Sequence, residues 1–554
     1  MADQPEGSIA ARCIHFARQG MVAFSYDMTG YNDTIFPDHA FDSTFKSTFY
    51  QRHRRFATNE VNLLWNIHLM GLQSWNSIRA LDFLESLPDV DKSRLACTGE
   101  SGGGTQTYIL GAIDDRLAVQ APVVMVSHSM QGGCSCENAP GLRVNHSNVE
   151  IAAVAAPRPQ IIVAATGDWT KDTMTMEGPS IAGIYNHFKA SERFHHVMFD
   201  FRHNYNQTSR EAVYAFFAQH LRPVTPLLKE LPYTKEPDAT LRVFPEGQLP
   251  ESALPEQDLI QRLQAGATER LERIRPTDKK SLARFKELMA PAWRHTLLAE
   301  MPPGGLWTQT IYVQARENYT AEKIIFGRNE KGDRILSLLL SPLEKGRNLV
   351  VILAHPEGLA AYLDREQKPS GLAKMLLEKR VHVLLLDTFL TGEACNPEVA
   401  NARSKQVELF FTTYNKTDTQ ERVQDLITAA GMIRQKRRHA TVALGGAGLA
   451  GLWALLAAPA ADAVVVDLNQ LDVDNDVSWL HRDVFVPGIR LLGGVEGVAT
   501  LAAPNPLLIH NLKPGFSDRW LREVYAGLKT SKSFMLSKEK TSEERIADWL
   551  TALK

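Results

Sequence analysis

The strongest constraint on the fold is an internal repeat. The same succession of a helix, an apolar run and a glycine-rich turn occurs twice in the 554-residue chain. In each copy a helical segment precedes a short apolar run that ends in an aspartate: residues 21–26 before Asp27, and residues 381–386 before Asp387. Such a run after a helix is typical of a buried parallel strand. The pattern therefore predicts two α/β domains with mainly parallel sheets.

Later landmarks keep the same order. A helical pattern in each copy leads into a strand pattern and a glycine-rich turn, at Ser101 in the first copy and Ala447 in the second. An Ala-Pro pair follows in both. Pro157 lies 56 positions after Ser101, and Pro504 lies 57 positions after Ala447. Four landmarks in one order at similar spacing indicate a duplication.

These landmarks place the domain boundaries. The first domain is predicted to cover residues 1–221 and the second residues 321–554. Residues 222–320 begin Pro-rich and continue as charged helical stretches, which predicts a linker with helices. The second domain is expected to open with a hairpin over residues 322–340, which turns at residues 329–332.

Composition argues against some partners. The net charge is −2 and the sequence pI is about 6.8, so no concentrated basic field predicts binding to nucleic acid or to a membrane surface. Residues 440–461 are uncharged, but a glycine cluster and Pro459 interrupt them. We interpret this stretch as a buried strand, a turn and a buried helix rather than a membrane span.

The five cysteines are too few and too scattered for a disulfide scaffold. Cys134 and Cys136 form a C-x-C pair, which is either two ordinary thiols in a turn or a metal or redox pair. No metal and no cofactor is expected at the site described next.

A nucleophile is predicted at Ser101. Residues 99–103 fit G-x-S-x-G, with a strand predicted before the motif and a helix after it. The glycines let the backbone pass through a strained turn that presents Ser101 at the helix N-terminus. There the Gly102 N–H and the helix dipole favour a developing oxyanion.

A serine needs a base, and in this motif class the chain order is Ser, acid, His. Asp168 follows the strand candidate at residues 160–165, and His203 follows the one at residues 197–201. Both positions lie at the carboxyl edge of a parallel sheet, where ligands bind. We therefore expect Asp168 to orient His203, with Asp172 in reserve as the acid.

The second copy lacks these groups. Ala447 stands where Ser101 does, the position matching Asp168 falls near Gly515, and the position matching His203 falls at residues 536–538. The second domain is therefore expected to be catalytically degenerate, with a role in structural support, substrate contact or pairing.

Four sequence segments in the first copy also resemble those of a known family. They are YDMTGY at residues 26–31, GLQSWNS at 71–77, GESGGGTQT at 99–107 and QGGCSCEN at 131–138. They resemble bacterial acetylxylan-esterase-like and dienelactone-hydrolase-like proteins of the α/β-hydrolase type, and the similarity spans residues 9–221. The resemblance implies two tandem α/β-hydrolase-like domains and metal-free hydrolysis of carboxylic esters. The substrates it implies are small-molecule or carbohydrate esters, often acyl groups on plant polysaccharides. It also implies a triad of Ser101, Asp168 and His203.

The loop at residues 131–138 follows a strand at the same edge, so it is either part of the pocket wall or a glycine turn capped by Asn138. Some related carbohydrate esterases place the catalytic acid after this strand, which makes Glu137 the alternative acid. The pocket-lining candidates are Glu100, Gln131, Cys134, Asn138 and Trp169.

One departure concerns the start of the chain. The second domain has a strand and loop at residues 348–358 that align before Met1 of the first domain. That loop normally supplies the second oxyanion donor. Either the chain begins inside its first domain, or another segment fills the gap. The chain starts without a signal peptide pattern, and a truncated start would be consistent with a secreted or periplasmic protein. Localisation and oligomeric state are left unassigned.

Two other functions stay open. A serine peptidase of the oligopeptidase type would use the same motif, and a non-catalytic binding or scaffold protein would explain the degenerate second copy.

Overall fold

The structure is a computed structural model that describes residues 8–31, 34–40, 55–223, 226–241, 243–244, 248–301 and 305–553. The chain divides into two compact units. Unit 1 comprises Met1–Asn59 and Ile67–Gln261, and unit 2 comprises Glu60–Asn66 and Arg262–Lys554. Several positions of the predicted linker, 224–225, 242, 245–247 and 302–304, lie outside the described residues.

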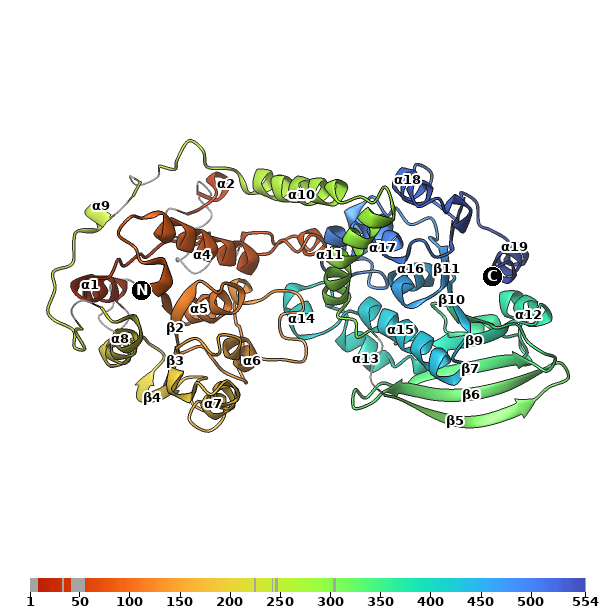
Figure 1. Ribbon diagram of the computed structural model, residues 1–554, viewed down its shortest axis with the longest axis horizontal. Coiled ribbons are helices and arrows are strands. Elements are labelled where there is room, and N and C mark those ends of the chain that lie inside the picture. The colour runs from red at the N-terminus through yellow and green to blue at the C-terminus, as the bar shows by residue number, and fades with distance from the viewer. Residues whose placement is uncertain are drawn as a thin grey trace. The chain divides into compact units, whose positions relative to one another are not determined.

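Unit 1 is built on a parallel sheet in the order β1-β2-β3-β4 (Figure 1). Its strands are β1 (Leu95–Glu100), β2 (Leu117–Val123), β3 (Gln160–Gly167) and β4 (Phe194–Arg202). Helices join consecutive strands, as parallel pairing requires. The helices of this unit are α1 (Ile9–Arg18), α2 (Pro37–Ala40), α4 (Leu69–Ser86), α5 (Gly102–Ile113), α6 (Asn148–Ala153), α7 (Glu177–His187), α8 (Gln207–Leu221) and α9 (Asp238–Leu241).

Side-chain alternation along β3 buries both faces of this sheet. Ile161 and Val163 pack with Phe217 of α8 on one face. Ile162 packs with Ile181 of α7 on the other. The sheet is therefore the middle layer of the unit. The loops that follow its strands lie together at the carboxyl edge of the sheet.

The strand predicted at residues 21–26 is wrong. This segment is not in a sheet, and its side chains are half-buried or exposed. Its counterpart in unit 2, β9 (His382–Asp387), pairs with β8 (Leu349–Ala354), which separates β9 from β10 (Thr441–Gly446). Among the described residues of unit 1 nothing corresponding to β8 lies beside β1, so residues 21–26 have no backbone partner. An apolar run without a hydrogen-bonding neighbour does not form a strand.

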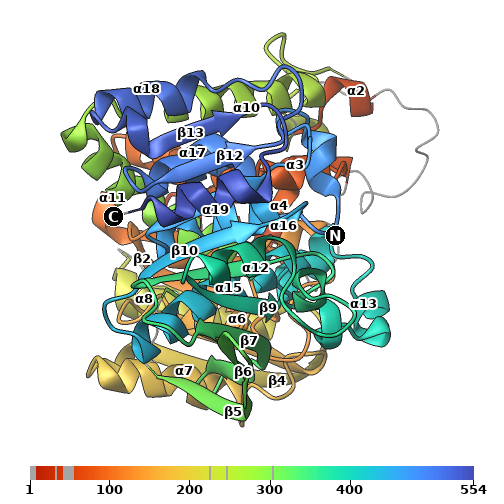
Figure 2. The ribbon, with the colours of Figure 1, turned by 90° about the vertical axis from the view of Figure 1, so that its right-hand side faces the viewer.

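Unit 2 contains a nine-stranded sheet within the described residues, in the order β13-β12-β11-β10-β8-β9-β7-β6-β5 (Figure 2). The remaining strands are β5 (Leu306–Ala315), β6 (Tyr319–Arg328), β7 (Ile335–Pro342), β11 (Ala463–Asp467), β12 (Leu507–His510) and β13 (Phe534–Ser537). Strands β8 to β13 are parallel to one another. The pairs β5–β6, β6–β7 and β7–β9 are antiparallel. The α/β class with mainly parallel sheets is confirmed.

Helices cover both faces of this second sheet. The helices α12 and α19 pack side by side on one face through Leu376 and Ile546 (Figure 2). The helices of unit 2 are α3 (Val61–Leu64), α11 (Lys279–Leu297), α12 (Gly371–Glu378), α13 (Pro397–Ala402), α14 (Leu409–Tyr414), α15 (Asp418–Lys436), α16 (Ala450–Leu456), α17 (Gly494–Ala502), α18 (Arg519–Gly527) and α19 (Glu543–Thr551); α10 (Glu256–Arg273) crosses the boundary between the units.

Predictions for the second half are mixed. The hairpin is confirmed as β6 and β7, and the uncharged stretch at residues 440–461 is confirmed as the buried strand β10, a turn and α16. β5 was not predicted, because its side chains are largely exposed and lack a buried pattern. Among the described residues, no helix has the length and apolar character that a membrane crossing needs.

Candidate active site

Ser101 occupies a strained turn between β1 and α5. Its backbone has φ 56° and ψ −119°, a region that costs a non-glycine residue of order 1–3 kcal/mol. A Cβ atom on Gly99 would lie 2.4 Å from the carbonyl oxygen of Gly103, and one on Gly104 would lie 2.8 Å from Cβ of Met125. Gly99 therefore allows the first turn of α5 to pass close to the end of β1, and Gly104 allows α5 to pack against the end of β2.

Backbone contacts hold this turn at the carboxyl edge of the sheet. The Ser101 N–H donates to the carbonyl of Val123 at the end of β2 (3.0 Å), and the Ser101 carbonyl accepts from the Thr105 N–H (2.9 Å). Ser101 is thus the N-cap residue of α5, and its side chain sits where the helix dipole favours negative charge. Gly102, the first residue of α5, has an N–H without an intrahelical acceptor.

Asp168 and His203 meet at the same edge, from the ends of β3 and β4. Nδ1 of His203 donates to Oδ2 of Asp168 at 2.9 Å. The Asp168 side chain is 1% exposed, whereas that of His203 is 29% exposed. The buried carboxylate therefore fixes the tautomer of a more open imidazole and leaves its Nε2 as the acceptor.

Neighbours hold this pair in place. The second oxygen of Asp168, Oδ1, accepts from the Thr170 N–H at 2.6 Å and from the Thr170 hydroxyl at 2.5 Å. The Trp169 ring packs on the His203 ring, with centroids 4.4 Å apart. Sequence reasoning missed Thr170, although the Asp-x-Thr pattern is a signal of a local side-chain cap.

Within the described residues no hydrogen bond joins the Ser101 hydroxyl to His203. Both residues follow strands of one parallel sheet, at the same edge. Catalytic hydrogen bonds are often long before substrate binds. The arrangement supplies a serine at a helix N-terminus and an oriented imidazole, which are the parts that acyl transfer needs.

Glu137 lies next to the first turn of α5. Its side chain is 7% exposed, and its Oε1 would be 3.6 Å from a Cβ atom on Gly102. Its Oε2 accepts from the backbone N–H groups of Gly133 (2.8 Å) and Cys134 (3.0 Å). Burial raises the pKa of the Glu137 carboxyl group, an effect that these backbone donors oppose. The acid bonded to His203 is Asp168 and not Glu137.

The rest of this loop is bound to itself. The Asn138 amide is fully buried and donates to the carbonyls of Gly132 and Cys134. Gln131 accepts from the Asn148 N–H through its side chain. The thiols of Cys134 and Cys136 are buried and hydrogen-bond each other. These contacts give Gln131 and Asn138 a structural role in shaping the loop.

Glu100, the last residue of β1, is only partly exposed beside Ser101. Burial raises the pKa of its carboxyl group, and the charges of Arg12, His203 and Arg210 oppose that rise. A carboxyl group here lies close enough to His203 to interact with it electrostatically. The structure therefore brings Glu100, Glu137, Trp169 and the Asp168–His203 pair to one edge with Ser101.

In unit 2 the backbone amide at the turn that corresponds to Ser101 already has a hydrogen-bond acceptor. The Gly448 N–H, which corresponds to that of Gly102, donates to Oδ2 of Asp467 at 3.2 Å. Oδ1 of Asp467 accepts from the Asn469 N–H and from the Asn511 side chain. The Gly448 N–H therefore already has a carboxylate oxygen as its acceptor.

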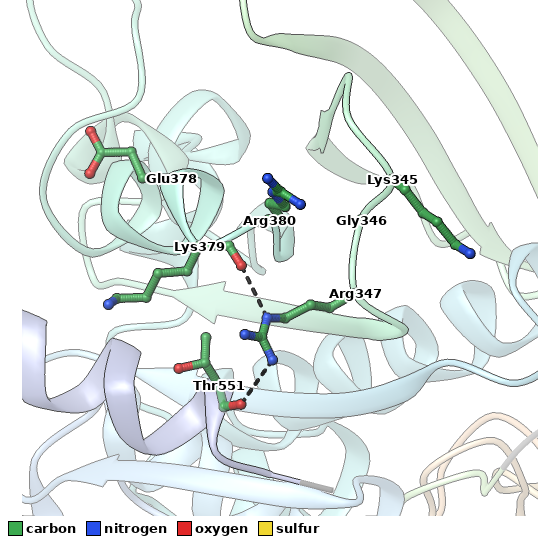
Figure 3. Close-up of a pocket in the computed structure, with 7 residues that line it drawn as sticks. All are labelled: Lys345, Gly346, Arg347, Glu378, Lys379, Arg380 and Thr551. Carbon is green, nitrogen blue, oxygen red and sulfur yellow. Dashed lines mark hydrogen bonds between the residues drawn. The ribbon is translucent and has the colours of Figure 1, made fainter.

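A hollow in unit 2 lies at the other edge of its sheet, before β8 and β9 (Figure 3). Arg347 donates to the carbonyls of Lys379 and Thr551 (both 3.2 Å), and Arg380 pairs with Glu344. Most of its basic groups therefore serve contacts within the unit.

No family model matches the chain. A curated protein, "Putative hydrolase YtaP" of Bacillus subtilis (strain 168), is 27% identical over 108 residues, which are 18% of this chain and 36% of that protein. The chain thus spans about a third of the length of this relative.

Several esterases are among the solved structures that the chain resembles. Methylesterase BT1017 is 30% identical with a TM-score of 0.39, over 47% of this chain and 56% of that one. A glucuronoyl esterase from Solibacter usitatus is 10% identical with a TM-score of 0.36, over 50% and 93%. Acetyl xylan esterase 1 from Thermoanaerobacterium sp. is 13% identical with a TM-score of 0.32, over 48% and 92%.

Proposed function

We propose that the chain is a serine hydrolase that cleaves carboxylic esters through an acyl-enzyme, with Ser101 as the nucleophile. The observation that carries the proposal is the position of Ser101, on a strained helix-capping turn at the sheet edge that also holds the Asp168–His203 pair. Strain at a non-glycine residue persists where the surroundings impose it, and such sites are often functional.

In this proposal the Ser101 Oγ attacks the ester carbonyl carbon while Nε2 of His203 takes its proton. Asp168 stabilises the resulting imidazolium, and the Gly102 N–H stabilises the oxyanion. His203 then protonates the leaving alcohol. Water attacks the acyl-enzyme by the same route and releases the acid.

We further propose carbohydrate esters of the xylan type as the substrate class, which rests on the motif resemblance alone. The second unit is proposed to be non-catalytic, because the Asp467 carboxylate accepts from the Gly448 N–H, the group that corresponds to the Gly102 N–H.

The test is hydrolysis by the purified chain of p-nitrophenyl acetate, acetylated xylo-oligosaccharides and short peptide amides, beside Ser101→Ala. Ester turnover that the variant lacks supports the proposal. Turnover of amides in preference to esters would favour the peptidase. Hydrolysis of neither by the folded protein would leave a binding or scaffold protein.

A further inference from the structure

A second histidine–carboxylate pair lies in the loops at the carboxyl edge of the unit 1 sheet. Nδ1 of His128 lies 2.8 Å from Oε1 of Glu177, and the same oxygen accepts from the backbone N–H of His128 at 3.0 Å. His128 lies in the loop after β2, and Glu177 is the first residue of α7. One carboxylate oxygen therefore holds both the backbone and the ring of His128.

The bonding of Glu177 serves this histidine. Its side chain is fully buried, and its hydrogen bonds within the described residues go to His128 alone, because its Oε2 is buried without a partner. Burying a carboxylate is costly, and its place at a helix N-terminus offsets only part of that cost. Since a carboxylate accepts hydrogen bonds, Nδ1 of His128 carries the proton and Nε2 keeps a lone pair.

The loop that carries His128 begins and ends beside the nucleophile. At its start the carbonyl of Val123 accepts from the Ser101 N–H at 3.0 Å. Near its end Oε1 of Glu137 would be 3.6 Å from a Cβ atom on Gly102, the residue after Ser101. The loop between these two contacts therefore belongs to the edge of the sheet that holds Ser101.

His128 follows a contact between this loop and the acid–base pair. The Ser127 hydroxyl donates to the carbonyl of Trp169 at 2.9 Å, and the Trp169 ring packs on that of His203. Ser127 is fully buried, whereas the His128 side chain is 40% exposed and its Nε2 has no partner among the described residues. A fixed hydrogen-bond acceptor is thus open to solvent among the loops that hold the candidate active site.

We propose that His128 is a specificity-determining residue, whose Nε2 accepts a hydrogen bond from a hydroxyl group on the alcohol part of the ester, so that the site prefers esters of polyhydroxylated alcohols. Glu177 is its positioning residue. An acceptor that is already fixed loses little freedom when substrate binds, and a site that bonds a hydroxyl group discriminates against the analogue without it. The inference rests on the proposed function and derives the substrate class from the site instead of from the sequence resemblance.

The experiment uses His128→Asn in the full-length chain. The asparagine amide reaches the position of Nδ1 and keeps a donor for Glu177, but it places no atom at the position of Nε2. The measured quantity is kcat/KM for an acetylated xylo-oligosaccharide and for cyclohexyl acetate, whose six-membered ring carries no free hydroxyl group. We expect a loss of about three- to tenfold for the sugar ester alone, with an unchanged melting temperature.

A second variant and a control complete the comparison. His128→Gln extends its amide toward the position of Nε2, so it should keep more of the preference for the sugar ester than His128→Asn. His187→Asn changes an exposed histidine at the other end of α7 and should leave both rates unchanged.

The outcomes separate this inference from the proposed function. Equal losses on both esters in His128→Asn, no loss on the sugar ester, or a greater loss of preference in His128→Gln would overturn the role of His128. Wild type that hydrolyses cyclohexyl acetate but not the sugar ester would also overturn it, and would leave the esterase proposal in place. Wild type that hydrolyses neither ester would contradict the proposed function, and the inference would fall with it.

Discussion

Nδ1 of His203 lies 2.9 Å from Oδ2 of Asp168, and this contact leaves Nε2 as the only imidazole nitrogen available to a serine. The two residues are 35 positions apart in the chain and come from the loops after adjacent strands. Parallel pairing of β3 with β4 is therefore what creates the pair.

Replacing Asp168 tests this pair. In Asp168→Asn the amide would favour the wrong imidazole tautomer, so we expect kcat for an acetyl ester to fall by about 10³–10⁴ with the fold intact. Asp172→Asn, four positions along the same loop, is the control and should keep most of the activity. Equal losses in both variants would contradict the assignment of Asp168.

The turn at Ser101 predicts opposite effects for two neighbouring glycines. Gly99→Ala places a methyl group 2.4 Å from the Gly103 carbonyl oxygen, and we expect a loss of about 2–4 kcal/mol in the free energy of unfolding together with loss of serine reactivity. Gly103→Ala meets nothing within 4 Å and lies in α5, so its stability should be equal or higher. Chemical denaturation of both variants checks this, and a destabilised Gly103→Ala would count against the described turn.

The sequence predicted most of unit 1 because its signals are local. The apolar patterns predicted the strands that precede Asp168 and His203, and the glycines around Ser101 predicted the turn. Residues 21–26 were misjudged because an apolar run does not reveal whether a partner strand lies beside it. The contact of Glu137 with the start of α5 joins segments 35 positions apart, and no sequence periodicity encodes such a contact.

The second unit shows a similar limit. Its missing serine is visible in the sequence at Ala447, but the bond between Asp467 and the Gly448 N–H depends on the pairing of β10 with β11. The short segment Glu60–Asn66 belongs to unit 2 through the burial of Leu64 and the bond from Trp65 to Asp476. Its few residues carry no periodic signal long enough to predict that contact.

Restoring a serine to unit 2 should not restore activity. In Ala447→Ser on a Ser101→Ala background, the Asp467 carboxylate still occupies the Gly448 N–H, so we expect no reaction with a fluorophosphonate. Peptide mapping by mass spectrometry is the readout. A modified position 447 would show that the second unit retains a usable oxyanion site.

Glu496, on α17, predicts a pH-dependent stability. Burial raises its pKa to about 7, Asp474 and Glu272 add to the rise, and Arg275 opposes it. The folded state therefore binds the proton more tightly than the unfolded state, and stability should fall as pH rises from about 4.5 to about 7. A shift of this size is worth at most about 3 kcal/mol, which partial exposure reduces to about 1–2 kcal/mol.

Glu496→Gln should remove that pH dependence and should be more stable than wild type at pH 8. Urea unfolding at pH 5 and pH 8 measures it, with Glu523→Gln, an exposed glutamate on α18, as the control. A variant that loses as much stability as wild type between the two pH values would contradict the role of Glu496.

The most direct test of the central claim is labelling of the purified chain with a fluorophosphonate, followed by mass-spectrometric mapping of the modified residue. We predict one label, on Ser101, that Ser101→Ala abolishes without a change in melting temperature. A folded wild-type protein that takes no label, or takes it at another residue, would contradict the assignment of Ser101 as an activated nucleophile.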